Sequence, residues 1–108
     1  MIARVWKGWA TPDGADGYAA YYREEVLPGL SRIEGFSGAE LLRRDDGDEV
    51  EFVSITRFES MAAVRAFAGD NPDVAVVTPH ARQLLSRFDS TCAHYTIDVA
   101  EGERADNG

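Results

Sequence analysis

The chain has 108 residues, 44% of them hydrophobic and 28% charged, which is typical of one globular domain with its own core. Its formal net charge of −8 argues against nucleic acid and anionic membrane surfaces as partners, because phosphate contacts need clustered lysine and arginine. The single cysteine, Cys92, excludes an intrachain disulfide and fits a reducing cytoplasm, where we expect the protein; no signal peptide or membrane-spanning apolar run is visible.

Residues 2–10 form the first predicted strand, and they include the run RVWKGW. Successive side chains of a strand point to opposite faces, so Trp6 and Trp9, three positions apart, must lie on opposite sides of the sheet. A half-solvated sheet would keep one face polar. The pair therefore predicts a sheet that is covered on both faces.

A helix should follow, capped by Thr11 or Asp13 and running to about Ile33 before Gly35 stops it. Pro28 lies inside the pattern and should kink or split the helix. The apolar stripe that supports this prediction has helical spacing and consists of Tyr18, Tyr22, Val26, Leu30 and Ile33.

Residues 36–44 and 49–58 are predicted to form a hairpin around an Asp46-Gly47 turn. This register places Arg44 opposite Glu49 and sorts the side chains into two faces. One face would carry Ala39, Leu41, Val50, Phe52, Ser54, Thr56 and Phe58. The other would carry Phe36, Glu40, Leu42, Val53, Ile55 and Arg57. In this register Arg57 and Glu40 are too far apart to pair, so we expect each to find a partner across a subunit interface or to lie at the rim of that interface.

Ser60 should cap a second helix that Gly69 ends, with Met61, Val64, Phe67 and Ala68 as its inner stripe. The chain then continues as a short piece that begins at Asn71-Pro72, where Asn71 is a capping candidate, and is broken by Pro79.

A helical turn at about 80–86 and a last strand at 91–99 complete the domain, which we place at residues 1–100. The polar residues 101–108 should be a flexible tail.

The element order β-α-β-β-α-β predicts an α+β, ferredoxin-like fold with a four-stranded antiparallel sheet. Such a sheet carries helices on one face only. Because its other face also contains apolar residues, the simplest way to cover that face is a second copy of the chain, stacked sheet to sheet.

The sequence resembles the antibiotic biosynthesis monooxygenase family of dimeric α/β barrels. The similarity lies in MIARVW, LPGLSRIEGFSGAELLRR, FVSITRFESMAAVRAFAGDNPDVAV and HYTIDV, which together span most of the chain to about Val99. The resemblance implies a homodimer and a pocket between sheet and helices in each subunit. Trp6 should then face the helices and the pocket, and Trp9 the partner subunit. Members oxidise polyketide aromatics with molecular oxygen and no cofactor, degrade haem, or have no known activity.

Two comparisons with that family concern single residues. Quinone-forming members carry an Asn and a Trp four residues apart on the third strand, and the matching positions here are Ser54 and Phe58. Haem-degrading members use an Asn, a Trp and an iron-binding His. In this sequence the corresponding positions look to be occupied by Trp6, Phe67 and Val77. Because Val77 cannot bind iron, haem degradation by that arrangement is not expected; His80 would have to act as a shifted ligand.

We therefore expect a cofactor-independent monooxygenase that acts on a small aromatic or polyketide-like compound without a metal. His80 is the candidate base, because histidine is the side chain most often used as a general base, and Ser54 and Tyr22 are the hydrogen-bonding candidates. The expected substrate-binding residues are Trp6, Phe52, Phe58, Phe67 and Asn71.

Two other functions stay open: a non-catalytic ligand-binding or stress-related dimer, and an atypical haem-binding protein. Plainer roles also stay open for single residues. His80 could be a surface loop residue, Trp6 and Cys92 could be core packing, and His94 could make a structural hydrogen bond at the sheet edge. The substrate is not readable from the sequence.

Overall fold

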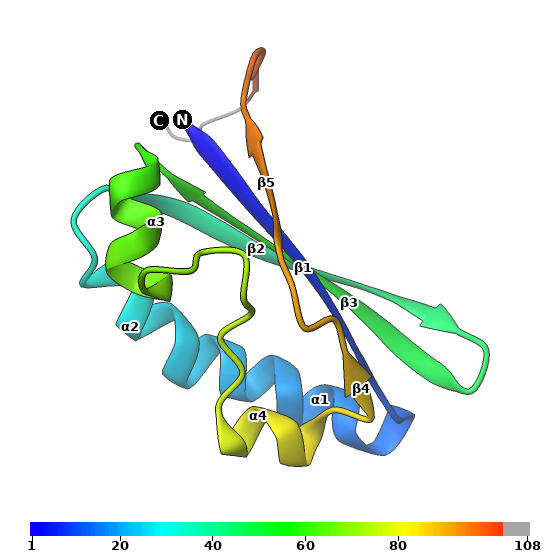
Figure 1. Ribbon diagram of the computed structural model, residues 1–108. Coiled ribbons are helices and arrows are strands. Elements are labelled where there is room, and N and C mark those ends of the chain that lie inside the picture. Colours follow the sequence, from blue (N-terminus) through cyan, green and yellow to red (C-terminus); the bar gives the residue numbers. More distant parts are fainter. Residues whose placement is uncertain (103–108) are drawn as a thin grey trace.

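The computed structural model describes residues 1–102. A single antiparallel sheet carries the helices on one of its faces (Figure 1). The sheet order is β2-β3-β1, and two short strands, β4 and β5, both pair with the other edge of β1. The strands are β1 (Ile2–Ala10), β2 (Phe36–Asp46), β3 (Glu49–Phe58), β4 (Arg87–Phe88) and β5 (Ala93–Thr96). This topology confirms the predicted α+β, ferredoxin-like fold. Most of the tail expected at 101–108 lies outside the described residues.

The first helical segment has three parts: α1 (Pro12–Tyr21), the π-helical turn η1 (Tyr22–Val26) and α2 (Leu27–Ser31). Thr11 caps it, because its hydroxyl accepts a hydrogen bond from the backbone N–H of Gly14 at 3.2 Å. The π-helical turn comes directly before Pro28, which has no N–H to donate to the preceding turn. Pro28 was predicted to kink or split the helix; the helical backbone does not split but continues through Pro28 to Ser31, with the π-helical turn before it.

Two further helices lie on the same face of the sheet, α3 (Met61–Ala68) and α4 (Pro79–Leu84). Ser60 caps α3 as predicted, and Gly69 ends it at a φ of +91°. Thr78 caps α4 in the same way, with its hydroxyl 3.2 Å from the backbone N–H of Ala81. In residues 1–102, no helix has the length and apolar character that a membrane span requires.

The hairpin of β2 and β3 is shifted by two residues from the predicted register. Asp46 pairs with Glu49, so the two-residue turn consists of Gly47 and Asp48, and Gly47 takes a φ of +66°. Arg44 therefore lies opposite Glu51 and not Glu49. A shift of two positions keeps every side chain on its predicted face, because strand side chains alternate with a period of two.

Two expectations for this hairpin are wrong. Arg57 does pair with Glu40 within the hairpin, Nη1 to Oε1 at 2.8 Å, since the shift brings the two side chains together diagonally. Phe36 lies on the helix-covered face, because a bulge between Phe36 and Gly38 reverses its direction. Its ring packs edge-on against Phe58, with 5.8 Å between the ring centroids.

The last strand expected at residues 91–99 is shorter, β5, and together with the unexpected β4 it forms an interrupted edge of the sheet. β4 pairs with the end of β1 and β5 with its beginning, while the chain between them turns toward residues 73–75. There the N–H of Cys92 donates to the carbonyl of Asp73 at 2.8 Å, and the N–H of Ala75 donates to the carbonyl of Ser90 at 2.9 Å. The segment before α4 is thereby fixed beside the sheet.

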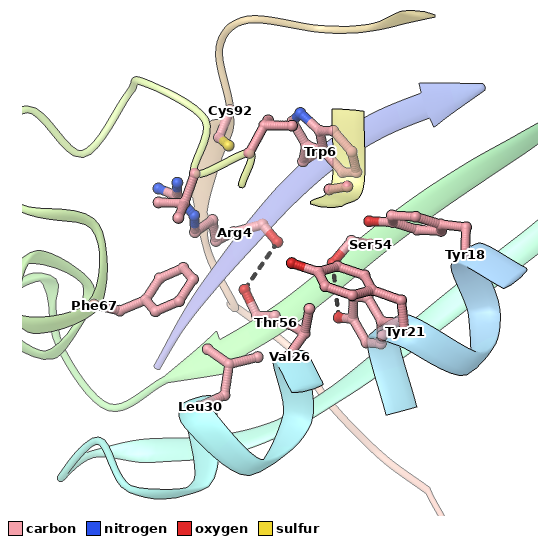
Figure 2. Close-up of a pocket in the computed structure, with 14 residues that line it drawn as sticks. Arg4, Trp6, Tyr18, Tyr21, Val26, Leu30, Ser54, Thr56, Phe67 and Cys92 are labelled. Atoms are coloured by element: carbon pink, nitrogen blue, oxygen red, sulfur yellow. Dashed lines mark hydrogen bonds between the residues drawn. The ribbon is translucent and has the colours of Figure 1, made fainter. Parts of the chain in front are cut away.

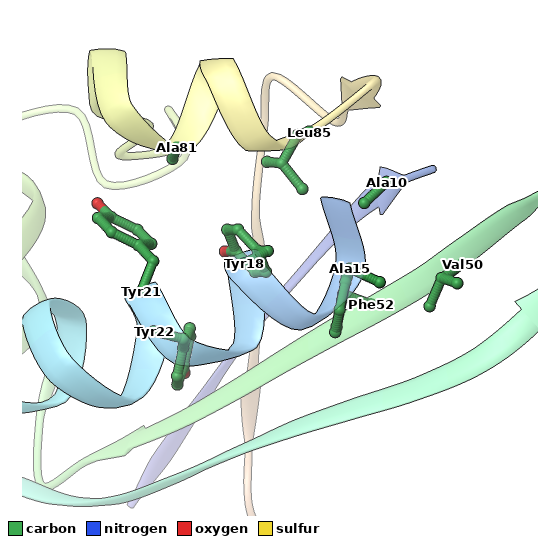
Figure 3. Close-up of a cluster of buried hydrophobic side chains, with 9 residues drawn as sticks. All are labelled: Ala10, Ala15, Tyr18, Tyr21, Tyr22, Val50, Phe52, Ala81 and Leu85. Atoms are coloured by element: carbon green, nitrogen blue, oxygen red, sulfur yellow. The ribbon is translucent and has the colours of Figure 1, made fainter. Parts of the chain in front are cut away.

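The core between sheet and helices has two centres. The first packs α1 and α4 against β3 and contains Tyr18 against Phe52, with ring centroids 5.0 Å apart (Figure 3). The second packs α2 and α3 around Phe58. The side chains buried with Phe58 are Leu30, Ala63 and Val64.

No helix covers the second face of the sheet in the described residues (Figure 1). Its partly exposed apolar side chains are Ala3, Val5, Leu42, Val53 and Ile55. Trp9 lies on this face as predicted, but its own chain packs against it. Arg87 stacks on the ring at 4.0 Å, and the indole N–H donates to Asp46 at 3.2 Å. Trp9 was expected to pack against a partner subunit, and its packing within its own chain makes that expectation wrong.

Candidate functional site

A cavity of about 60 Å³ lies between the sheet and the helices (Figure 2). β1 contributes Trp6 and Arg4 to its wall, and β3 contributes Ser54. The opposite wall comes from the tyrosines of the first helical segment, and the segment before α4 closes one side. The cavity is mainly aromatic and aliphatic, with a few polar groups that point inward, as is usual for a small-molecule site.

Of the predicted site residues, Trp6, Ser54, Tyr22 and Phe67 line this cavity. They come from β1, β3, η1 and α3, so the fold brings together residues that lie far apart in the sequence. Alternation along β1 and β3 explains why the two strand residues share one face.

Phe52, Phe58 and Asn71 were predicted to bind substrate, but none of them lines the cavity. Both phenylalanines have no exposed surface: Phe52 is covered by Tyr18, and Phe58 packs against other phenylalanines. Asn71 lies in an exposed turn, where its carbonyl accepts a hydrogen bond from the N–H of Val74 at 3.2 Å. The phenylalanines support the walls of the cavity without reaching its interior.

His80 is not among the lining residues either. It lies on α4 with about half of its side chain exposed, and its ring packs edge-on against Tyr21 at 4.9 Å. The sequence indicated no carboxylate partner for it, but Glu25 supplies one at 3.4 Å from Nδ1. Tyr21 lines the cavity, so His80 borders it through this ring and makes no direct contact with its interior.

The hydroxyls of Tyr22 and Ser54 are 2.8 Å apart and buried. Burial raises the pKa of Tyr22, and the hydrogen bond to Ser54 opposes part of that rise. Burial also raises the pKa of the neighbouring Tyr18. The phenols are therefore neutral near pH 7 and able to donate a hydrogen bond, which is the form that stabilises an oxyanion.

Sequence reasoning missed Arg4 and Cys92 as lining residues. Arg4 is 4% exposed, and its guanidinium donates to the carbonyls of Pro72 and Val74. The one available signal was that Arg4 lies two positions before Trp6 on the same strand, so the two side chains point to the same face of the sheet. Cys92 is buried as expected, and burial raises the pKa of its thiol, so the thiol stays protonated.

The position of Trp6 depends on Gly8, two residues along the same strand. A Cβ at Gly8 would lie 2.7 Å from Cη2 of Trp6, so only glycine lets the indole pack over the strand. In this position the indole N–H donates to the carbonyl of Asp89 at 2.7 Å. Gly8 thus sets the shape of this wall.

Gly8→Ala is expected to displace the indole of Trp6 and to lower stability by about 1–3 kcal/mol, the usual cost of overpacking. The readouts are urea unfolding and Trp6 fluorescence in a Trp9→Phe background. Gly29→Ala is the matched control, because a Cβ there meets no atom within 4 Å. An unchanged emission spectrum in Gly8→Ala would show that the contact does not hold the ring.

The site does not fit haem bound in the manner of the resembling haem degraders. Val77, at the position of the iron ligand, lines the cavity with an apolar side chain. Within residues 1–102, no three His, Cys, Asp or Glu residues gather where they could hold a metal ion. The cavity volume corresponds to about four to six water molecules, so the cavity must widen before it holds any aromatic ligand.

Comparisons with known proteins agree with this fold. The family model described as Antibiotic biosynthesis monooxygenase matches residues 1–74, more than half of the chain. A search of curated proteins finds no significant match.

Two solved structures with the same fold are similar over nearly their whole length. The haem degrader MhuD of Mycobacterium tuberculosis, solved with two haems in its active site, is 20% identical, with 94% of this chain and 100% of that chain covered and a TM-score of 0.60. A Streptomyces coelicolor monooxygenase from the gene ActVA-Orf6, in complex with Nanaomycin D, is 15% identical, with 94% and 91% covered and a TM-score of 0.61. At these identities the likeness establishes the fold alone.

Proposed function

Because the chain belongs to the antibiotic biosynthesis monooxygenase family, we propose that it is a cofactor-independent oxygenase for a small aromatic compound. In the proposed reaction, a CH₂ group activated by neighbouring aromatic rings or a carbonyl becomes C=O. One atom of O₂ enters the product and the other leaves as water, so the substrate supplies all four electrons that reduce O₂. The substrate anion itself passes electrons to oxygen, and no redox cofactor is needed.

The observation that carries this proposal is the buried Tyr22–Ser54 pair in an aromatic-walled cavity. When the substrate loses a proton, negative charge gathers on its oxygen. A neutral phenol or hydroxyl that is already oriented can donate to that oxygen, and it costs little reorganisation. Tyr22 and Ser54 are therefore assigned to anion stabilisation, and the aromatic wall with Trp6 to binding and to the exclusion of water.

His80 remains our candidate for the base. Since Tyr21 separates it from the cavity, we propose that the proton reaches His80 through a water molecule or after movement of the Tyr21 ring. The carboxylate of Glu25 near Nδ1 would orient the imidazole for that transfer.

The test is oxygen uptake with a panel of anthrones and hydroquinones. For a turned-over substrate, Tyr22→Phe is expected to lower kcat by about 10²-fold, as for the loss of one oxyanion donor. Tyr95→Phe is the matched control, because Tyr95 is 58% exposed and lies outside the cavity. Equal rates in Tyr22→Phe and the parent would remove this residue from the mechanism. No uptake across the panel, with ligand-induced thermal stabilisation, would favour a binding protein instead.

We also propose that the protein is a homodimer, joined through the sheet face that no helix covers. The support is the apolar set on this face of β1, β2 and β3, which would otherwise meet water. A second copy with the same face is the simplest complement.

A further inference from the structure

Arg4 is a buried cation without a carboxylate of its own. The residue is 4% exposed, and among residues 1–102 no Asp or Glu oxygen lies within 4.0 Å of its guanidinium. Buried charges in proteins are normally paired, because an unpaired ion loses its hydration without compensation. Within the described part of the chain, the positive charge of Arg4 is therefore not balanced by a direct ion pair.

The hydrogen bonds of the guanidinium account for only part of its donors. Nη1 donates to the carbonyl of Pro72 and to Nε2 of His94 at 3.0 Å, and Nη2 donates to the carbonyl of Val74 at 3.1 Å. A guanidinium carries further N–H groups, at Nε and at the second position of Nη2, and for these the described residues offer no acceptor. Arg4 therefore keeps free donors.

The contact with His94 also fixes the state of that ring. Since arginine can only donate, Nε2 of His94 must accept, and the ring proton sits on Nδ1. Nδ1 then faces the carboxylate of Asp73, whose Oδ1 is 3.4 Å away. Burial, followed by the charge of Arg4, lowers the pKa of His94, so the ring is neutral near pH 7. The His94 ring thus lies between Asp73 and the guanidinium of Arg4. Asp73 can help to position the guanidinium through this ring, but it does not contact the guanidinium directly.

Arg4 borders the same cavity as the Tyr22–Ser54 pair. Its side chain lies between Phe67 and Cys92 in Figure 2, and the centre of the guanidinium is 5.7 Å from the centroid of the Phe67 ring. The cavity therefore combines flat apolar walls with one fixed positive charge, a pattern that suits an aromatic ring carrying an oxyanion.

We propose that the cavity binds an aromatic acid as its anion, with an oxygen of the ligand accepting hydrogen bonds from the free N–H groups of Arg4. The ring of the ligand would lie against Phe67 and Trp6. This names the substrate class of the proposed oxygenase and rests on that cavity being the ligand site. His94 and Asp73 are positioning residues that hold the guanidinium toward the cavity.

The experiment compares benzoate with benzamide, which have nearly the same shape but differ in charge, by calorimetry without oxygen. The parent protein is expected to bind benzoate about 10- to 100-fold more tightly than benzamide, in line with a charge-assisted hydrogen bond. Arg4→Met should abolish this preference, and Arg4→Lys should keep part of it. Arg65→Met removes the same charge from an exposed site on α3 and should leave the preference intact.

Circular dichroism checks that Arg4→Met is folded. If it is not, His94→Phe replaces it: the loss of Nε2 frees the guanidinium to shift, and the benzoate preference should fall.

Equal affinity for the two ligands in the parent, or a preference that survives in Arg4→Met, would overturn the proposal. Since binding is measured without oxygen, the outcome is independent of turnover. Arg4-dependent benzoate binding by a protein that consumes no oxygen would refute only the oxygenase function.

Discussion

Phe58→Ala is expected to lower the free energy of unfolding by about 3–5 kcal/mol, the usual cost of deleting a buried phenyl ring. Phe58 has no exposed surface and packs edge-on against Phe36 and parallel to Phe67, with ring centroids 5.8 and 6.2 Å apart. Removing it leaves a void beneath α3, which the rigid strand cannot fill. Urea unfolding followed by circular dichroism measures the loss.

Phe58→Leu is the control, because it keeps most of the apolar volume and should cost clearly less than the alanine variant. The resemblance to quinone-forming oxygenases would instead place the residue at this position in the pocket. If Phe58 contacted the ligand, Phe58→Leu would alter ligand affinity while leaving stability nearly intact. A strong affinity change with little loss of stability would contradict its assignment to the core.

Ile55→Asp is expected to convert the proposed dimer into a monomer. Ile55 sits at the centre of the uncovered sheet face, opposite Val5 on one side and Glu40 on the other. A carboxylate there would be desolvated against the apolar partner face, which should weaken association by more than about 100-fold. Light scattering should give twice the chain mass of 11.9 kDa for the parent and the single mass for the variant.

Ala66→Asp provides the same charge at an exposed position of α3, away from the sheet face, and should leave the dimer intact. Trp9 is a poorer site for this test, because Arg87 and Asp46 of the same chain already contact it. A parent protein that is monomeric at micromolar concentration would refute the dimer proposal.

Local signals in the sequence predicted most of the fold. Side-chain alternation assigned Trp6 and Trp9 to opposite faces, and the cap at Ser60 and the stop at Gly69 mark the observed ends of α3. The hairpin register was wrong by two residues, because Asp46-Gly47 and Gly47-Asp48 are both acceptable turn pairs. The observed pairing of Asp46 with Glu49 selects Gly47-Asp48 as the turn.

The site was harder to predict because it depends on contacts between distant segments. Trp6, Ser54, Tyr22 and Phe67 follow from their faces on strands and helices, whereas His80 does not reach the cavity. Arg4 carries a charge, and its burial requires carbonyls that lie about seventy positions further along the chain. No local sequence pattern predicts hydrogen bonds between an arginine and carbonyls so far along the chain.

The interruption of the last strand has a consequence for ligand entry. One wall of the cavity comes from the segment before α4, which is tied to the chain between β4 and β5 by a bridge between Val74 and Thr91 and a few flanking backbone hydrogen bonds. These bonds lie outside the long β1–β3 ladder. Breaking them is a sub-global opening whose free energy is a fraction of that of complete unfolding. An opening that also releases the hydrogen bonds of Arg4 to Pro72 and Val74 would let the cavity exchange its contents with solvent while the sheet stays intact.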